Sequence, residues 1–176
     1  MSLLVFLMKI GDDLIIFDRL KSSLYYRKHD FVTGAWKHLV LIFLHPKCQF
    51  SKKIIEELNY IQIRFNEHIE IIGLQIPLNA ITNNFTNSND QEINNNLNFK
   101  ILDNVPIEII AKYEISIIPQ ALVFKNKKLV YKGAINDNPL EPEKIKHHYL
   151  TEVLEKIMRN LKFVPFYPPI GTKLEN

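Results

Sequence analysis

The sequence predicts an α/β protein with a mixed parallel and antiparallel central sheet flanked by helices, and three observations lead to this class. First, an apolar run at residues 36–44, a helical pattern at 48–66 and a second apolar run at 69–76 form a strand, helix, strand unit. The crossover of such a unit is right-handed and its strands are parallel. Second, residues 120–135 hold two β-type runs joined by a short polar turn, which predicts an antiparallel hairpin. Third, a last helical pattern covers about 142–161.

Shorter elements are predicted between these. They are two edge strands or a hairpin at 14–17 and 24–27, a brief strand at 99–103 and a short helix at 105–113. Residues 79–98 are crowded with Asn, Thr and Ser, which predicts a surface excursion with one short helix near 90–96. Residues 163–176 carry several prolines, and we expect them to run extended along the surface.

Length and charge narrow the class of protein. We expect a single domain over residues 1–176, with N-terminal strands or an extension in 1–35, a core in 36–161 and an extended tail in 162–176. The 22 basic and 19 acidic residues nearly balance, and they lack the clustered Lys and Arg excess of a nucleic-acid footprint. No apolar run reaches the roughly 18 residues of a membrane span. We therefore predict neither nucleic acid as a partner nor a membrane span.

Cys48 is the only cysteine, and it lies where the first predicted strand leads into a helix. Exposed backbone N–H groups and the positive end of the helix dipole at such a position favour the thiolate over the thiol. The alternative is that Cys48 is a small buried hydrophobe, as free cysteines usually are. One cysteine cannot form an internal disulfide, so the sequence gives no indication of the compartment.

Three segments share a pattern with one known family. Residues 40–48 lead from a strand through a Pro-containing turn to Cys48, residues 113–124 place Pro119 before a β-type run, and residues 128–137 form a strand and a turn. Together they resemble the thioredoxin-like, redoxin-domain family. In that family the first segment holds the redox cysteine, and the second carries a cis proline opposite it. The resemblance implies a thioredoxin fold.

The resemblance continues to the tail and covers about residues 36–172. Residues 146–150 and 169–172 are similar to the C-terminal part of the redoxin group. Members with such a tail often carry a cysteine directly after the glycine that matches Gly171, and this chain has Thr172 there. A distant resolving cysteine is therefore missing.

The turn around Cys48 also departs from the family. Dithiol members have a second cysteine three residues after the first, where this chain has Ser51. The peroxiredoxins, the peroxide-reducing branch, place Thr or Ser three residues before their cysteine and Pro four residues before that, where this chain has His45 and Leu41. A self-contained dithiol cycle is excluded, so any mixed disulfide or sulfenic acid at Cys48 needs an external thiol.

Several neighbours of Cys48 are candidate site residues with two interpretations each. Ser51 lies one helical turn on and could donate a hydrogen bond to the sulfur, or it is simply a first-turn residue. His45 could stabilise a thiolate when protonated, or it is a turn residue in solvent. Lys47 could add positive charge near the sulfur, or its side chain is solvated.

The partner side of the candidate site rests on the family. The resemblance implies that Pro119 is cis and that it brings the backbone of Ile118 next to Cys48, where an extended peptide would pair in a mixed disulfide. His147 and His148 are adjacent, and neighbours on a helix point about 100° apart, so we predict no metal site there.

Two functions follow from these observations. The favoured one is a thiol-dependent redox protein that uses Cys48 in thiol–disulfide exchange or peroxide reduction, with an external protein thiol or reductant as partner and no cofactor. The alternative is a redox-inactive thioredoxin-fold binding module. The missing second cysteine, Thr172 in the tail, and Gln49 where relatives commonly have Pro favour the alternative.

Overall fold

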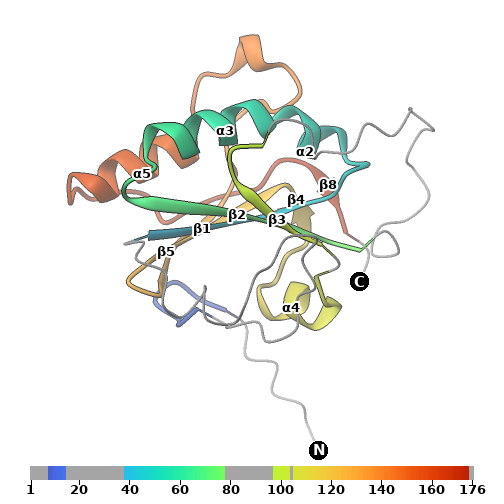
Figure 1. Ribbon diagram of the computed structural model, residues 1–176, viewed down its shortest axis with the longest axis horizontal. Coiled ribbons are helices and arrows are strands. Elements are labelled where there is room, and N and C mark those ends of the chain that lie inside the picture. Colours follow the sequence, from blue (N-terminus) through green and yellow to red (C-terminus); the bar gives the residue numbers. More distant parts are fainter. Residues whose placement is uncertain (1–7, 15–37, 78–96, 104, 175–176) are drawn as a thin grey trace, which may run out of the picture.

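A mixed sheet forms the centre of the molecule. The computed structural model describes residues 8–14, 38–77, 97–103 and 105–174 (Figure 1). Within these residues, one sheet has the strand order β3-β2-β1-β5-β6-β7. Its strands are β1 (His38–Leu44), β2 (Ile69–Gln75), β3 (Lys100–Leu102), β5 (Gln120–Lys125), β6 (Lys128–Gly133) and β7 (Phe166–Tyr167). The strand β2 pairs in parallel with β1 and β3, whereas β5 runs antiparallel to both β1 and β6. The predicted mixed sheet is confirmed.

The strand β1 lies in the middle because its side chains are apolar on both faces. Every residue of the strand is buried. Its alternate side chains enter two separate core clusters, Leu39, Leu41 and Phe43 on one side and Val40, Ile42 and Leu44 on the other. A strand with this pattern needs cover on both faces of the sheet.

Helices supply that cover on both faces. They are α2 (Gln49–Lys53), α3 (Ile55–Arg64), α4 (Ile107–Lys112) and α5 (Tyr149–Met158). Figure 1 shows α2, α3 and α5 on one face of the sheet and α4 on the other. A second small sheet joins β4 (Ile117–Ile118) to β8 (Thr172–Lys173), which is part of the tail.

Two predicted helices differ from the structure. The helix expected at 48–66 is divided at Ile54 into α2 and α3. The last helix starts at Tyr149 and not at Pro142, because the segment before it is hydrogen-bonded to the loop at Asp137. The side chain of Asp137 accepts a hydrogen bond from the backbone N–H of Lys146, and its backbone N–H donates to the carbonyl of His147. Residues 142–144 form only a 3₁₀ turn. Asn160 has a left-handed φ of 54°, which is consistent with the helix ending before 161.

The tail, which we expect to run extended along the surface, forms two short strands: β7 pairs with β6 in the main sheet and β8 pairs with β4. The predicted strand at 24–27, most of the one at 14–17 and the helix near 90–96 lie outside the described residues.

Replacing Tyr131 with Phe is expected to lower the free energy of unfolding by about 1–2 kcal/mol. Tyr131 is fully buried, and its hydroxyl donates a hydrogen bond of 2.5 Å to the carbonyl of Ala134. The substitution removes the Tyr131 hydroxyl and leaves the buried carbonyl of Ala134 without this hydrogen bond. Urea unfolding measures the change, with Tyr60→Phe on the exposed side of α3 as a control that should change stability by less than about 0.5 kcal/mol. Equal effects of the two substitutions would contradict the prediction.

Candidate functional site

The turn between β1 and α2 places Cys48 inside the molecule. The backbone N–H of Cys48 donates to the carbonyl of His45 at 3.0 Å, which closes the turn. The backbone N–H of His45 donates to the hydroxyl of Ser51 at 3.2 Å. Cys48 is the N-cap residue of α2 with extended backbone angles, and its side chain is 0% exposed. The sulfur is therefore covered from solvent in this conformation.

His45 is a buried and neutral part of this turn. Its side chain is 0% exposed, and burial together with the charge of Lys47 lowers the pKa of the imidazole from 6.5 to about 4. The ring Nδ1 accepts the backbone N–H of Lys47 at 3.1 Å, so the neutral ring carries its proton on Nε2. Neither interpretation from the sequence fits, because the residue is not in solvent and is not protonated at pH 7.

The sulfur of Cys48 has two polar neighbours. The hydroxyl of Thr172 lies 3.2 Å from Sγ, and either atom can be the donor. The S–H group also points to the carbonyl of Ile118 at 3.8 Å. The peptide bond between Ile118 and Pro119 is cis, as the family resemblance implied. Segments far apart in the sequence thus meet at one sulfur atom.

The other predicted site residues lie close by but make different contacts. The hydroxyl of Ser51 accepts the backbone N–H of His45 and so holds the turn. Lys47 has an exposed side chain at the tip of the same turn.

Thr172 is the residue that sequence reasoning missed. It stands where members of the redoxin group, which the tail resembles, often have a cysteine, and from the sequence it was interpreted only as a missing thiol. Antiparallel pairing of β8 with β4 brings it to the site, because Thr172 lies opposite Ile118. Beyond Thr172, the backbone N–H of Leu174 donates a hydrogen bond to the carbonyl of Ser116 at 2.8 Å. The side chain of Leu174 is buried in the same apolar cluster as Cys48.

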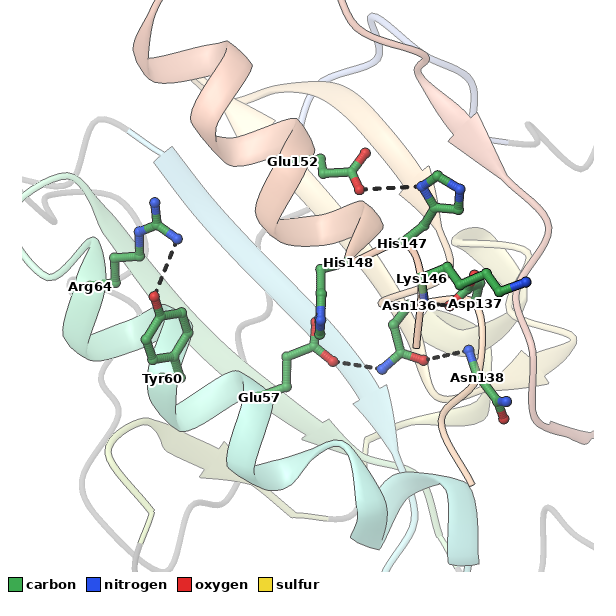
Figure 2. A network of polar contacts seen from close by, with 10 residues as sticks. All are labelled: Glu57, Tyr60, Arg64, Asn136, Asp137, Asn138, Lys146, His147, His148 and Glu152. Carbon is green, nitrogen blue, oxygen red and sulfur yellow. Dashed lines mark hydrogen bonds and ion pairs between the residues drawn. The ribbon is translucent and has the colours of Figure 1, made fainter. Parts of the chain in front are cut away.

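The two adjacent histidines belong to a separate polar network (Figure 2). His148 contacts Glu57 on α3, with 2.8 Å between Nδ1 and Oε1, whereas His147 contacts Glu152 on α5 at 3.6 Å. Asn136 donates to the second oxygen of Glu57 at 2.6 Å. The histidines thus pair with carboxylates on different helices and do not converge on one point.

Comparison with known proteins supports the fold at the level of structure. No protein-family model and no curated protein matches the sequence. A hypothetical protein from Sinorhizobium meliloti 1021 has a similar structure, with a TM-score of 0.73 and 14% identity over 95% of this chain and 94% of that one. The C-terminal domain of a predicted thiol-disulfide oxidoreductase from Bacteroides thetaiotaomicron gives a TM-score of 0.55 and 16% identity, covering 87% of this chain and 95% of that domain.

A thioredoxin-like protein solved in its oxidised form is also similar, with a TM-score of 0.51 and 10% identity over 73% of this chain and 82% of that one. The mixed sheet flanked by helices and these neighbours together define a thioredoxin-like fold, here with one cysteine. Among the described residues, no helix is long and apolar enough to span a membrane.

Proposed function

We propose that this protein is a thiol-dependent redox protein in which Cys48 acts as the single nucleophile in thiol–disulfide exchange. The observation that supports it most is the surroundings of the sulfur. Cys48 precedes a helix at the end of the central strand, and the Thr172 hydroxyl lies 3.2 Å from Sγ. A hydroxyl at that distance can donate a hydrogen bond to a thiolate and stabilise it.

The exchange reaction takes place in two steps. The Cys48 thiolate attacks one sulfur of a partner disulfide, so a bond forms between the two proteins while the partner's disulfide breaks. The departing partner sulfur leaves as a thiolate and takes a proton from solvent. The thiolate of an external thiol then attacks the mixed disulfide, bonds to the partner's sulfur and releases Cys48. Peroxide reduction at the same sulfur would also need external thiols, because it leaves a sulfenic acid on Cys48.

The neighbouring residues have supporting roles in this proposal. Ser51 holds the turn that carries Cys48, and Lys47 adds positive charge at the tip of the same turn. The neutral His45 contributes its ring as a hydrogen-bond acceptor within the turn and not as a cation. The backbone of Ile118, next to Pro119, is the edge that an extended partner would meet.

A redox-inactive binding module is the second candidate, and one observation favours it. The Cys48 side chain is completely buried, which is what a structural cysteine would show. In that case the surface near Ile118 would serve protein contact alone.

The folded protein is expected to form one mixed disulfide per chain when it is incubated with glutathione disulfide at pH 7.5. The physical reason is that only an accessible thiolate attacks a disulfide, so reaction of the native state requires both an activated sulfur and an opening of its cover. Intact mass spectrometry counts the adduct, and dithiothreitol should remove it. Cys48→Ser is the control, and it should form no adduct. An adduct that forms only after unfolding in urea, both in the natural chain and in a variant in which strand β8 is displaced, would sink the redox proposal and favour the binding module.

A further inference from the structure

The strand β8 occupies the edge of β4 in the way a bound peptide would. Within the described residues, β4 and β8 form a two-stranded sheet of their own. The register pairs Ile117 with Lys173 and Ile118 with Thr172. Pairing of an added strand with a sheet edge is a common mode of peptide recognition, in which backbone hydrogen bonds supply affinity.

This pairing blocks the path to the sulfur. The Thr172 hydroxyl lies 3.2 Å from Sγ of Cys48, and the buried Leu174, which is 5% exposed, anchors the strand one residue beyond Lys173. The sulfur of an incoming disulfide has to come closer to Sγ than this hydroxyl already is. A partner therefore reaches Cys48 by taking the place of β8.

The backbone geometry at Gly171 restricts which segment can take that place. A Cβ atom added to Gly171 would lie 1.9 Å from the carbonyl oxygen of Ile118 and 2.5 Å from its carbon. Real Cβ atoms do not approach other atoms so closely, so the close pairing of β8 with β4 needs glycine at this position. The same restriction applies to any strand that lies in the same register.

We propose that the edge of β4 is a docking site for an extended peptide with a glycine immediately before the residue that faces Cys48, and that β8 is its resident occupant. A partner segment with a disulfide-bonded cysteine directly after such a glycine would present its sulfur where the Thr172 hydroxyl lies. Cys48 would then bond to that sulfur while the partner's disulfide breaks, and the departing thiolate takes a proton from solvent. This chemical step rests on the proposed function, whereas docking does not.

Alkylation of Cys48 by iodoacetamide across a range of pH tests whether β8 covers the sulfur in the 176-residue chain. The plateau rate at high pH, where all of the sulfur is thiolate, reports access, and the midpoint of the profile reports stabilisation of the thiolate. Gly171→Ala should raise the plateau rate by about tenfold or more, because the added Cβ pushes β8 off β4. Lys173→Ala is the matched control on the same strand, and its exposed side chain can be removed with little effect on the plateau. A plateau in Gly171→Ala equal to that of the natural sequence would overturn the proposal.

A second variant covers the case in which Gly171→Ala fails to fold, as judged by near-UV circular dichroism. Leu174→Asp puts a charge in place of the buried anchor of the same strand and should also raise the plateau rate. An unchanged plateau in this variant would likewise overturn the proposal.

A peptide added in trans tests the glycine requirement. The probe has the sequence of residues 168–174, Pro-Pro-Ile-Gly-Thr-Lys-Leu. At increasing concentration it should slow the alkylation of the Gly171→Ala chain, whereas the same peptide with alanine in place of its glycine should not. Equal protection by the two peptides, or protection by neither, would overturn the proposal.

These outcomes are separate from the test of redox chemistry. If the Gly171→Ala chain shows the higher plateau and glycine-dependent protection but forms no adduct with glutathione disulfide, the redox proposal fails and the docking site stands. If the adduct forms equally well in the natural chain and in Gly171→Ala, Cys48 is reactive without displacement of β8, and the docking proposal fails.

Discussion

Replacing Thr172 with cysteine is expected to produce a chain that closes an intramolecular disulfide with Cys48 on air oxidation. The two side-chain atoms are already 3.2 Å apart, and a disulfide of about 2.05 Å needs only a small further approach. The residues are 124 positions apart in the sequence, so the chain-entropy model gives a stabilisation of about 4 to 5 kcal/mol for the oxidised form. Thiol titration and non-reducing mass spectrometry detect closure, and urea unfolding of the oxidised and reduced forms measures the gain.

The control for this substitution is Lys173→Cys, on the same strand. Successive side chains of a strand point to opposite sides, and that of Lys173 is exposed. Its cysteine should remain free or link two chains, without closing a loop to Cys48. Closure at similar rates in both variants would mean that β8 does not hold the register that places Thr172 against the sulfur.

The second large effect is a loss of stability in acid that depends on His45. The imidazole has a pKa of about 4 in the folded protein and 6.5 as its ordinary value, so the unfolded chain binds the proton more tightly. The stability that comes from keeping His45 neutral is therefore fully present above about pH 6.5. It is lost progressively as the pH falls from 6.5 to about 4. At about 1.4 kcal/mol for each pH unit between them, the loss at pH 4 is about 3 kcal/mol.

Urea unfolding at pH 7 and pH 4 measures this loss against a matched variant. His45→Asn keeps an acceptor for the backbone N–H of Lys47 but cannot titrate. Between pH 7 and pH 4 the free energy of unfolding of the natural chain should fall by about 3 kcal/mol more than that of His45→Asn. Other titrating groups contribute equally in both proteins, so their effect cancels in this difference. Parallel losses in the two proteins would show that the folded structure admits a proton at His45.

Much of the sheet was predictable because its strands carry strong local signals. The uncharged run that became β1, the second apolar run that became β2 and the polar turn between β5 and β6 can each be recognised from a few neighbouring residues. The same holds for the position of Cys48 between a strand and a helix. The cis bond before Pro119 was expected only from the family, because a single X-Pro bond carries no sign of its isomer.

The pairing of the tail was not predictable from local patterns. β4 and β8 are two residues each, too short to show alternation, and they lie about 50 residues apart in the sequence. The neutral state of His45 was also hidden, since it results from burial that only the folded turn creates. The hydroxyl of Ser51 turned toward the backbone of His45, a local bond that competes with any contact to the sulfur.

The linker between β7 and β8 is short, and its length determines how strongly β8 competes with a partner for the edge of β4. β7 is fixed beside β6, and only residues 168–171 separate it from β8. A strand tethered by so short a linker acts at an effective concentration in the millimolar range. A free peptide with equal contacts would therefore have to reach about that concentration to displace half of the tails. A folded partner that also contacts surface beyond β4 would displace β8 at a much lower concentration. Proteins are therefore favoured over small peptides as the molecules that open this site.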